Sequence, residues 1–219
     1  GKGDRVAGLV PNTPHAVAFM LATASLGAIW ASCSPDFGFS AAMDRLAQIE
    51  PKILVCANGY LYNGKSFSSL EVAEKLYHAI ESLDKIVVFD LIAQKQEALF
   101  DGAVSWQDFL SSFAADDIVF EAVETAHPLY IMFSSGTTGL PKCIVHSHGG
   151  TLLKHKQELL LHGDVREGDR LFYFTTCGWM MWNWSVSALM CGASLVLYDG
   201  SPFYPEPARF AKIIATEEV

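Results

Sequence analysis

Short apolar runs alternate with helical patterns along most of the 219-residue chain, and this alternation restricts the fold more than any other feature. The runs "KILVCA" at Lys52–Ala57 and "KIVVF" at Lys85–Phe89 have the length and the β-branched content of buried strands. Longer patterns between such runs predict helices; one of them begins at Thr13-Pro14, an N-cap followed by a first-turn proline. Strands that alternate with helices form βαβ units, so the sequence predicts an α/β fold with layered, largely parallel sheets flanked by helices.

The expected elements fill the chain except for a less regular stretch from Leu91 to His127, which contains one short helix. The fragment "GDR" occurs before a strand at Gly3–Val6 and again at Gly168–Leu171, which suggests two similar layered halves. The predicted strands are Asp4–Val10, Ala28–Ser32, Lys52–Ala57, Lys85–Phe89, Leu129–Met132, Ile144–His148, Arg170–Thr175 and Ser194–Tyr198. The predicted helices are Thr13–Leu26, Ser40–Ile49, Ser69–Leu83, Trp106–Phe113, Gly150–Leu161, Asn183–Cys191 and Glu206–Thr216.

Composition narrows the possible partners. The net charge of −9 argues against a nucleic-acid binder, which normally carries a basic face, and no apolar run is long enough to predict a membrane helix. An anionic ligand would need local positive charge, which Lys65 and Lys142 can supply. An odd number of cysteines without CxxC spacing favours packed thiols in a reducing, cytosolic setting over a metal or redox site. They are Cys33, Cys56, Cys143, Cys177 and Cys191.

The segment "FSSGTTGLPK" at Phe133–Lys142 has the chemistry of an anion-binding loop. Its hydroxyl groups can donate hydrogen bonds, its glycines let backbone amides approach an anion, and Lys142 adds a point charge. Pro141 makes the exit of the loop rigid. A polar surface turn is the alternative, but the loop lies between two predicted buried strands, where functional loops are often found.

A second segment, Gly59–Ser66, matches the G-x-x-x-x-G-K-S/T pattern of a P-loop, with Asp90 as a candidate magnesium ligand. Tyr60, Leu61 and Tyr62 are bulky for a tight phosphate nest, and the next helix is better capped at Ser68 or Ser69 than at Gly64. The P-loop NTPase therefore stays a minor alternative. If the segment is not a P-loop, Lys65 is a solvated loop lysine.

The Phe133–Lys142 segment fits the phosphate signature of the adenylate-forming superfamily at every position, and the chain resembles that superfamily. The signature is an aromatic residue, then Ser/Thr-Ser-Gly-Ser/Thr-Thr-Gly, any residue, and Pro-Lys. Cys143 follows where these enzymes usually have glycine. Other segments look like the acetoacetyl-coenzyme A synthetases within the superfamily. They are "SPDFG" at Ser34–Gly38, "YNGK" at Tyr62–Lys65, "GWMMWNW" at Gly178–Trp184 and "LYDGSP" at Leu197–Pro202.

The resemblance implies that residues 1–219 are part of the large N-terminal AMP-binding (adenylation) domain of a longer ligase, without its C-terminal lid domain. Such a ligase joins acetoacetate to coenzyme A through an acyl-adenylate and uses ATP and Mg²⁺. Small molecules are then the expected partners, with neither nucleic acid nor membrane. The alternatives are an acyl-coenzyme A synthetase for another short-chain acid, a truncated non-catalytic nucleotide-binding module, and the P-loop NTPase.

The resemblance also implies roles for individual residues. Lys142 and Thr137 would stabilise the departing pyrophosphate, and Lys65 would contact coenzyme A. The ATP phosphates would contact Ser134, Ser135, Gly136, Thr137, Thr138, Gly139 and Lys142. Trp179, Met180 and Met181 would line the acyl pocket, with plain core packing as the alternative.

Three further polar residues have open interpretations. His146 and His148 would point the same way on a strand, but no third ligand at a diagnostic spacing supports a zinc site, so packing is favoured and no metal ligand is assigned. Asp199 either marks a site at the carboxyl edge of a sheet or caps a turn.

Overall fold

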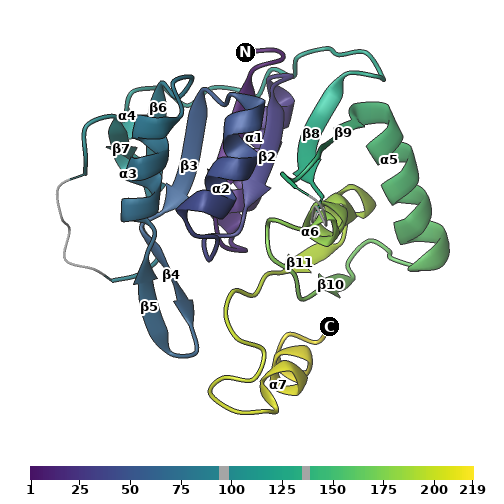
Figure 1. Ribbon diagram of the computed structural model, residues 1–219. Coiled ribbons are helices and arrows are strands. Elements are labelled where there is room, and N and C mark those ends of the chain that lie inside the picture. Colours follow the sequence, from purple (N-terminus) through teal and green to yellow (C-terminus); the bar gives the residue numbers. More distant parts are fainter. Residues whose placement is uncertain (94–98, 135–138) are drawn as a thin grey trace.

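The computed structural model describes residues 1–93, 99–134 and 139–219, and within them a seven-stranded sheet forms the centre of the molecule (Figure 1). Its strand order is β7-β6-β3-β1-β2-β8-β9, and every neighbouring pair is parallel except β8 and β9. The predicted α/β class with a largely parallel sheet is confirmed. The strands are β1 (Arg5–Leu9), β2 (Ile29–Cys33), β3 (Ile53–Ala57), β6 (Lys85–Phe89), β7 (Ala103–Ser105), β8 (Pro128–Phe133) and β9 (Cys143–Ser147).

Helices cover both faces of this sheet because its strands alternate side chains between two apolar cores. On one face, Leu9 and Leu54 pack with helices α2 (Phe39–Leu46) and α3 (Leu70–Ala79). On the other face, Trp30 and Val55 pack with α1 (Pro14–Ser25) and α6 (Met180–Val186). A strand buried on both sides needs the near-continuous apolar runs from which the sheet was predicted.

The remaining helices follow the expected pattern with shifted ends. They are α4 (Trp106–Ser111), α5 (His148–Gln157) and α7 (Arg209–Thr216), with short turns η1 (Ala47–Ile49), the π-helical η2 (Glu158–His162) and η3 (Ser187–Cys191). The helix predicted from Asn183 begins earlier, at Met180, and the one predicted from Glu206 begins later, at Arg209. Helix ends depend on caps and neighbours, which periodicity does not resolve.

The repeated "GDR" fragment marks a structural repeat. Strands β10 (Arg170–Phe172) and β11 (Ser194–Val196) form a second, two-stranded parallel sheet. In both sheets the arginine of the fragment pairs with a residue 24 positions later, Arg5 with Ile29 and Arg170 with Ser194. The backbone bonds match as well, since Gly3 N–H donates to Gly27 O and Gly168 N–H donates to Gly192 O. The structure therefore shows a local repeat of one pair of parallel strands, while the second sheet is much smaller than the first.

The segment that matches the P-loop pattern is an antiparallel hairpin, which projects beyond the sheet (Figure 1). Strands β4 (Gly59–Tyr62) and β5 (Lys65–Ser68) pair through the two-residue turn Asn63-Gly64, whose φ angles of 49° and 73° are typical of a type I′ turn. A P-loop needs a loop directly before a helix, so the NTPase interpretation of Gly59–Ser66 is wrong. Helix α3 has its N-cap at Ser69, as predicted.

Candidate functional site

The proposed phosphate loop connects the antiparallel pair β8 and β9, and its two ends are tied to each other. Ser134 N–H donates to Lys142 O at 3.0 Å, and Lys142 N–H donates to the Ser134 hydroxyl oxygen at 3.0 Å. The first bond continues the β8–β9 ladder by one step, and the second, to a side chain, helps to fix the base of the loop. Lys142 itself is exposed. Of the other predicted phosphate ligands, Gly139 is described and exposed, whereas Ser135, Gly136, Thr137 and Thr138 lie outside the described residues.

The exit of the loop is held by a side chain from another element. Gln48, in the turn η1 after α2, donates from Nε2 to Pro141 O at 2.9 Å. The Cys143 thiol, in turn, donates a hydrogen bond to Gln48 Oε1, with a sulfur–oxygen distance of 3.8 Å. Cys143, the residue that departs from the superfamily signature, therefore contacts the side chain that holds the end of the loop.

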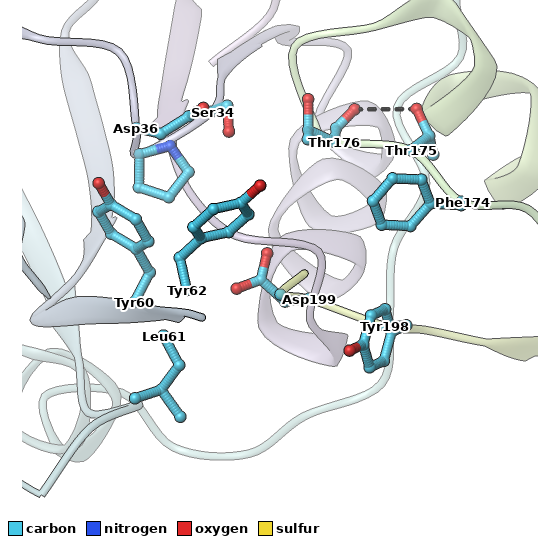
Figure 2. A pocket seen from close by; sticks show the side chains of 12 residues that line it. Ser34, Asp36, Tyr60, Leu61, Tyr62, Phe174, Thr175, Thr176, Tyr198 and Asp199 are labelled. Carbon is cyan, nitrogen blue, oxygen red and sulfur yellow. Dashed lines mark hydrogen bonds between the residues drawn. The ribbon is translucent and has the colours of Figure 1, made fainter. Parts of the chain in front are cut away.

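A cleft opens near the same edge of the molecule, where chain segments leave the carboxyl ends of parallel strands (Figure 2). This is the position at which α/β proteins usually bind ligands. Its volume is about 440 Å³, part of it open to solvent. The lining residues come from both halves: Ser34, Pro35 and Asp36 after β2; Tyr60, Leu61 and Tyr62 on β4; Phe174, Thr175 and Thr176 after β10; and Tyr198, Asp199 and Gly200 after β11.

The cleft combines aromatic walls with hydrogen-bond acceptors. The Ser34 residue is 5% exposed, and the buried hydroxyl of Thr176 has no hydrogen-bond partner among the described residues. Burial raises the pKa of Asp199; the N–H of Asn12, 3.4 Å from its Oδ1, opposes this shift, and the charge of Asp36 adds to it. Burial, with smaller contributions from Asp36 and Asp199, also raises the pKa of Tyr60. A ligand group in this cleft would be neutral or would donate hydrogen bonds, because the two carboxylates disfavour an anion.

Lys65 is on strand β5, across the hairpin turn from the β4 residues that line this cleft. It pairs with Tyr62 across the two strands, and it is exposed. A second hollow, lined by Tyr62, Asn63 and Gly64 of the hairpin and by Tyr204 and Arg209, adjoins the cleft. Arg209 thus lines the outer hollow and Lys65 adjoins it, whereas Asp199 lines both spaces and Asp36 lines the cleft alone.

The predicted acyl-pocket residues lie at the start of α6 and differ in burial. Trp179 is the N-cap and is 64% exposed, and Met180 is 45% exposed. Met181 is half-buried, and Trp182 is fully buried in the core. The lining of the cleft does not include the three predicted residues, although Trp179 N–H donates to the carbonyl oxygen of Thr176, which does line it. Trp182 is therefore a core residue, whereas Trp179 and Met180 are accessible to a ligand.

The two histidines considered for zinc have different surroundings. His146 is on β9, where its ring lies 5.5 Å from that of Tyr130, whereas His148 already belongs to α5 and lies beside His127 at 5.7 Å. The shared strand face that the sequence suggested does not exist, because β9 ends at Ser147. Within the described residues, no three His, Cys, Asp or Glu side chains are grouped as a metal site would require. The same residues include no helix long and apolar enough to span a membrane.

Several site residues carried no local signal in the sequence. Asn12 approaches Asp199, which lies 187 positions later in the chain. Asp36 likewise lines the same cleft as Tyr198 although the two are distant in the sequence. The single hint was the placement of Asp199 near a strand end, and the structure supports the site interpretation of that residue over the turn cap. The segment "LYDGSP" contains Tyr198, so its family resemblance could have indicated this residue but not the residues that it meets.

A loop with the phosphate signature follows strand β8, and a cleft lies at the carboxyl edge of the parallel strands. This arrangement is typical of nucleotide-binding α/β proteins. The sequence profile described as "AMP-binding enzyme" matches residues 1–219, so the chain belongs to the AMP-binding enzyme family. Its relatives point to one group within that family. The chain is 54% identical over 209 residues to the acetoacetyl-coenzyme A synthetase of Rhizobium meliloti (strain 1021), covering 94% of this chain and 32% of that protein.

Two further relatives, one of them a solved structure, match the same share of the chain. The solved acetoacetyl-CoA synthetase from Streptomyces lividans superposes with a TM-score of 0.87 at 43% identity, covering 94% of this chain and 31% of that one. Malonamoyl-CoA synthetase vrtB of Penicillium aethiopicum is 47% identical over 212 residues, covering 94% of this chain and 29% of that protein. The chain thus spans about a third of the length of these relatives.

Proposed function

We propose that this chain is part of the N-terminal adenylation domain of a longer ligase that joins acetoacetate to coenzyme A at the expense of ATP. The observation that carries the proposal is the complete phosphate signature at Phe133–Lys142, which begins at the end of strand β8 and is tied at its base by the Ser134–Lys142 bonds. The acetoacetyl-coenzyme A synthetases among the relatives support the choice of acid.

In the proposed first step, the carboxylate of the acid attacks the α-phosphorus of ATP, the bond to the β-phosphate oxygen breaks, and pyrophosphate leaves with the bonding electrons. Negative charge therefore grows on the pyrophosphate oxygens. Lys142 and the hydroxyl of Thr137 would stabilise that charge, together with the other donors of the loop, because donors positioned beforehand need not reorganise during the reaction. The Ser134–Lys142 bonds support this role by fixing where the lysine leaves the sheet.

Magnesium accompanies ATP in such reactions and would supply further charge neutralisation. Mg²⁺ of this kind is held mainly by the phosphate oxygens, with one or two protein carboxylates at most, so it needs no cluster of protein ligands, and we assign no step to it.

In the proposed second step, the thiol of coenzyme A attacks the acyl carbonyl carbon, and AMP leaves as the carbon–oxygen bond breaks. Arg209 lines the outer hollow, and Lys65 adjoins it through its strand partner Tyr62. These two cations would attract the phosphates of coenzyme A. The acid would lie against Trp179, Met180 and Met181; the exposure of Trp179 and Met180, which leaves them accessible to a small acyl group, supports this placement.

Acid-dependent exchange of labelled pyrophosphate into ATP tests the proposal on the full-length protein. Acetoacetate should support the fastest exchange, ahead of acetate, butyrate and malonamate. Faster exchange with malonamate or acetate would reject the acid while keeping the reaction class. No exchange with any carboxylic acid, combined with intact ATP binding, would favour the non-catalytic nucleotide-binding module.

A further inference from the structure

The side chain of Asn12 joins parts of the molecule that lie far apart in the sequence. It follows β1 at the carboxyl edge of the large sheet, and the residue is 5% exposed. Its Oδ1 accepts a hydrogen bond from Trp182 Nε1 at 3.0 Å, and its Nδ2 donates to Tyr198 O at 3.3 Å. One amide thus connects the first half to helix α6 and to the segment after β11.

The bond to Trp182 restricts the rotation of α6. The indole is fully buried against the first half, so the helix is fixed at this residue by both packing and a directional bond. Successive residues of a helix are about 100° apart around its axis. Fixing Trp182 therefore also fixes the directions of Met180 and Met181 and the position of the N-cap Trp179.

The bond to Tyr198 acts on a wall of the cleft. Tyr198 and Asp199 line it, and the backbone N–H of Asn12 lies 3.4 Å from Asp199 Oδ1. A substitution at Asn12 leaves that backbone contact in place. The side-chain bonds are therefore the part of the arrangement that mutagenesis can remove selectively.

We propose that Asn12 is a positioning residue for the acyl-binding region: through Trp182 it sets the orientation of the α6 residues, and through Tyr198 it sets the adjacent wall of the cleft. The proposal rests on the function proposed above, because it concerns how that reaction selects its acid. The phosphate loop, which is fixed by Ser134 and Gln48, does not depend on Asn12.

Asn58 provides a matched control. It is a buried asparagine at the end of the neighbouring strand β3, and within the described part of the chain its side chain bonds to the Asp90–Ile92 segment alone. Asn58→Ala removes a comparable set of buried hydrogen bonds without touching α6 or the residues after β11.

The experiment measures KM for acetoacetate and for ATP in pyrophosphate exchange by the full-length protein. Asn12→Ala should raise KM for acetoacetate at least about fivefold and leave KM for ATP within about twofold, because it removes interactions with only one substrate region. Trp182→Phe, which keeps an aromatic ring in the core, should act in the same direction. The double variant should show no more than the larger single effect, since both changes remove one shared bond. Asn58→Ala should lower Tm and leave the ratio of the two KM values unchanged.

Equal changes in both KM values for Asn12→Ala and Trp182→Phe would overturn the proposal, and so would additive effects in the double variant or a KM for acetoacetate that stays at the wild-type value. If Asn12→Ala does not fold, the Trp182→Phe result decides by the same criteria. Failure of the proposed function is a different result, because the wild-type protein would then show no acid-dependent exchange at all.

Discussion

Lys142 and Lys65 are both exposed lysines where the second strand of an antiparallel pair begins, but their surroundings differ. The backbone of Lys142 is bonded in both directions to Ser134 at the base of the signature loop. Lys65 begins the second strand of a hairpin and lies beside the hollow with Arg209. The two residues therefore serve as matched probes of the two proposed steps.

Lys142→Ala should reduce the rate of pyrophosphate exchange by about 10²–10³, the usual cost of one strong donor to a developing charge. Lys65→Ala should leave exchange close to wild type and raise KM for coenzyme A in the complete reaction. Single-step assays with and without coenzyme A separate the two effects. Loss of exchange in the Lys65 variant, with a normal Lys142 variant, would contradict both assignments.

At the scale of elements, the β4–β5 hairpin contributes to the cleft and to the adjoining hollow. Its turn depends on Gly64, which has a φ of 73°, a region that costs other L-residues about 1 kcal/mol or more. The Tyr204 hydroxyl is close to this glycine, so that a Cβ added at Gly64 would lie 2.2 Å from it. The contact joins the hairpin tip to the segment after β11.

Gly64→Ala should therefore destabilise the protein and raise KM for coenzyme A, because the hairpin must move away from Tyr204. Gly168→Ala is the control, since Gly168 has a similar φ of 87° with open space around its Cβ position. Urea denaturation should show a larger loss for Gly64→Ala than for Gly168→Ala. A Tyr204→Leu background should remove most of that difference; an unchanged difference would mean that the contact does not matter.

At the scale of the whole molecule, directional contacts involving buried side chains join the elements around the second sheet to one another and to the first sheet. Asn12 contacts Trp182, the Ser32 hydroxyl donates to Cys177 O at 2.7 Å, and His155 lies 2.8 Å from the Ser187 hydroxyl. The last contact joins α5 to η3 and includes a titratable group. Burial lowers the pKa of His155; nearby His146 lowers it further, while Glu158 opposes the shift.

Stability should consequently decrease as pH falls below the ordinary histidine value of about 6.5. In that range the unfolded chain binds a proton that the folded protein excludes, so the free energy of unfolding declines by at most about 1.4 kcal/mol per pH unit for each such histidine. His148, whose pKa is also lowered by burial and by His127, contributes in the same direction.

Urea denaturation of the full-length protein from pH 7.5 to 5 measures this dependence. His155→Gln keeps a polar partner for Ser187 but does not titrate, so its stability should vary less with pH than that of the wild type. His78→Gln is a suitable control, because His78 lies in the last turn of α3, away from this contact. An unchanged slope in the His155 variant would exclude His155 as a source of the pH dependence.

Much of the large sheet was predictable because each of its main strands is a run that is apolar on both faces. The phosphate loop was predictable for a related reason, since all its functional groups are consecutive in the chain. The hairpin was not predicted, although Asn63-Gly64 is a strong local turn signal, because the same residues also match the P-loop pattern. Strand β7, of three residues, is too short for periodicity to detect.

The sequence by itself therefore determined the α/β class, the internal repeat and the chemistry of the signature loop, all of which depend on residues that are neighbours or recur at a fixed spacing. Tertiary structure alone decided which groups face the cleft, that Trp182 is core while Trp179 is accessible, and that Asn12 links Trp182 to Tyr198. Parallel strands gather their carboxyl ends at one edge however far apart they lie in the chain. Contacts formed there join residues more than 100 positions apart, and no local pattern records which pairs will meet.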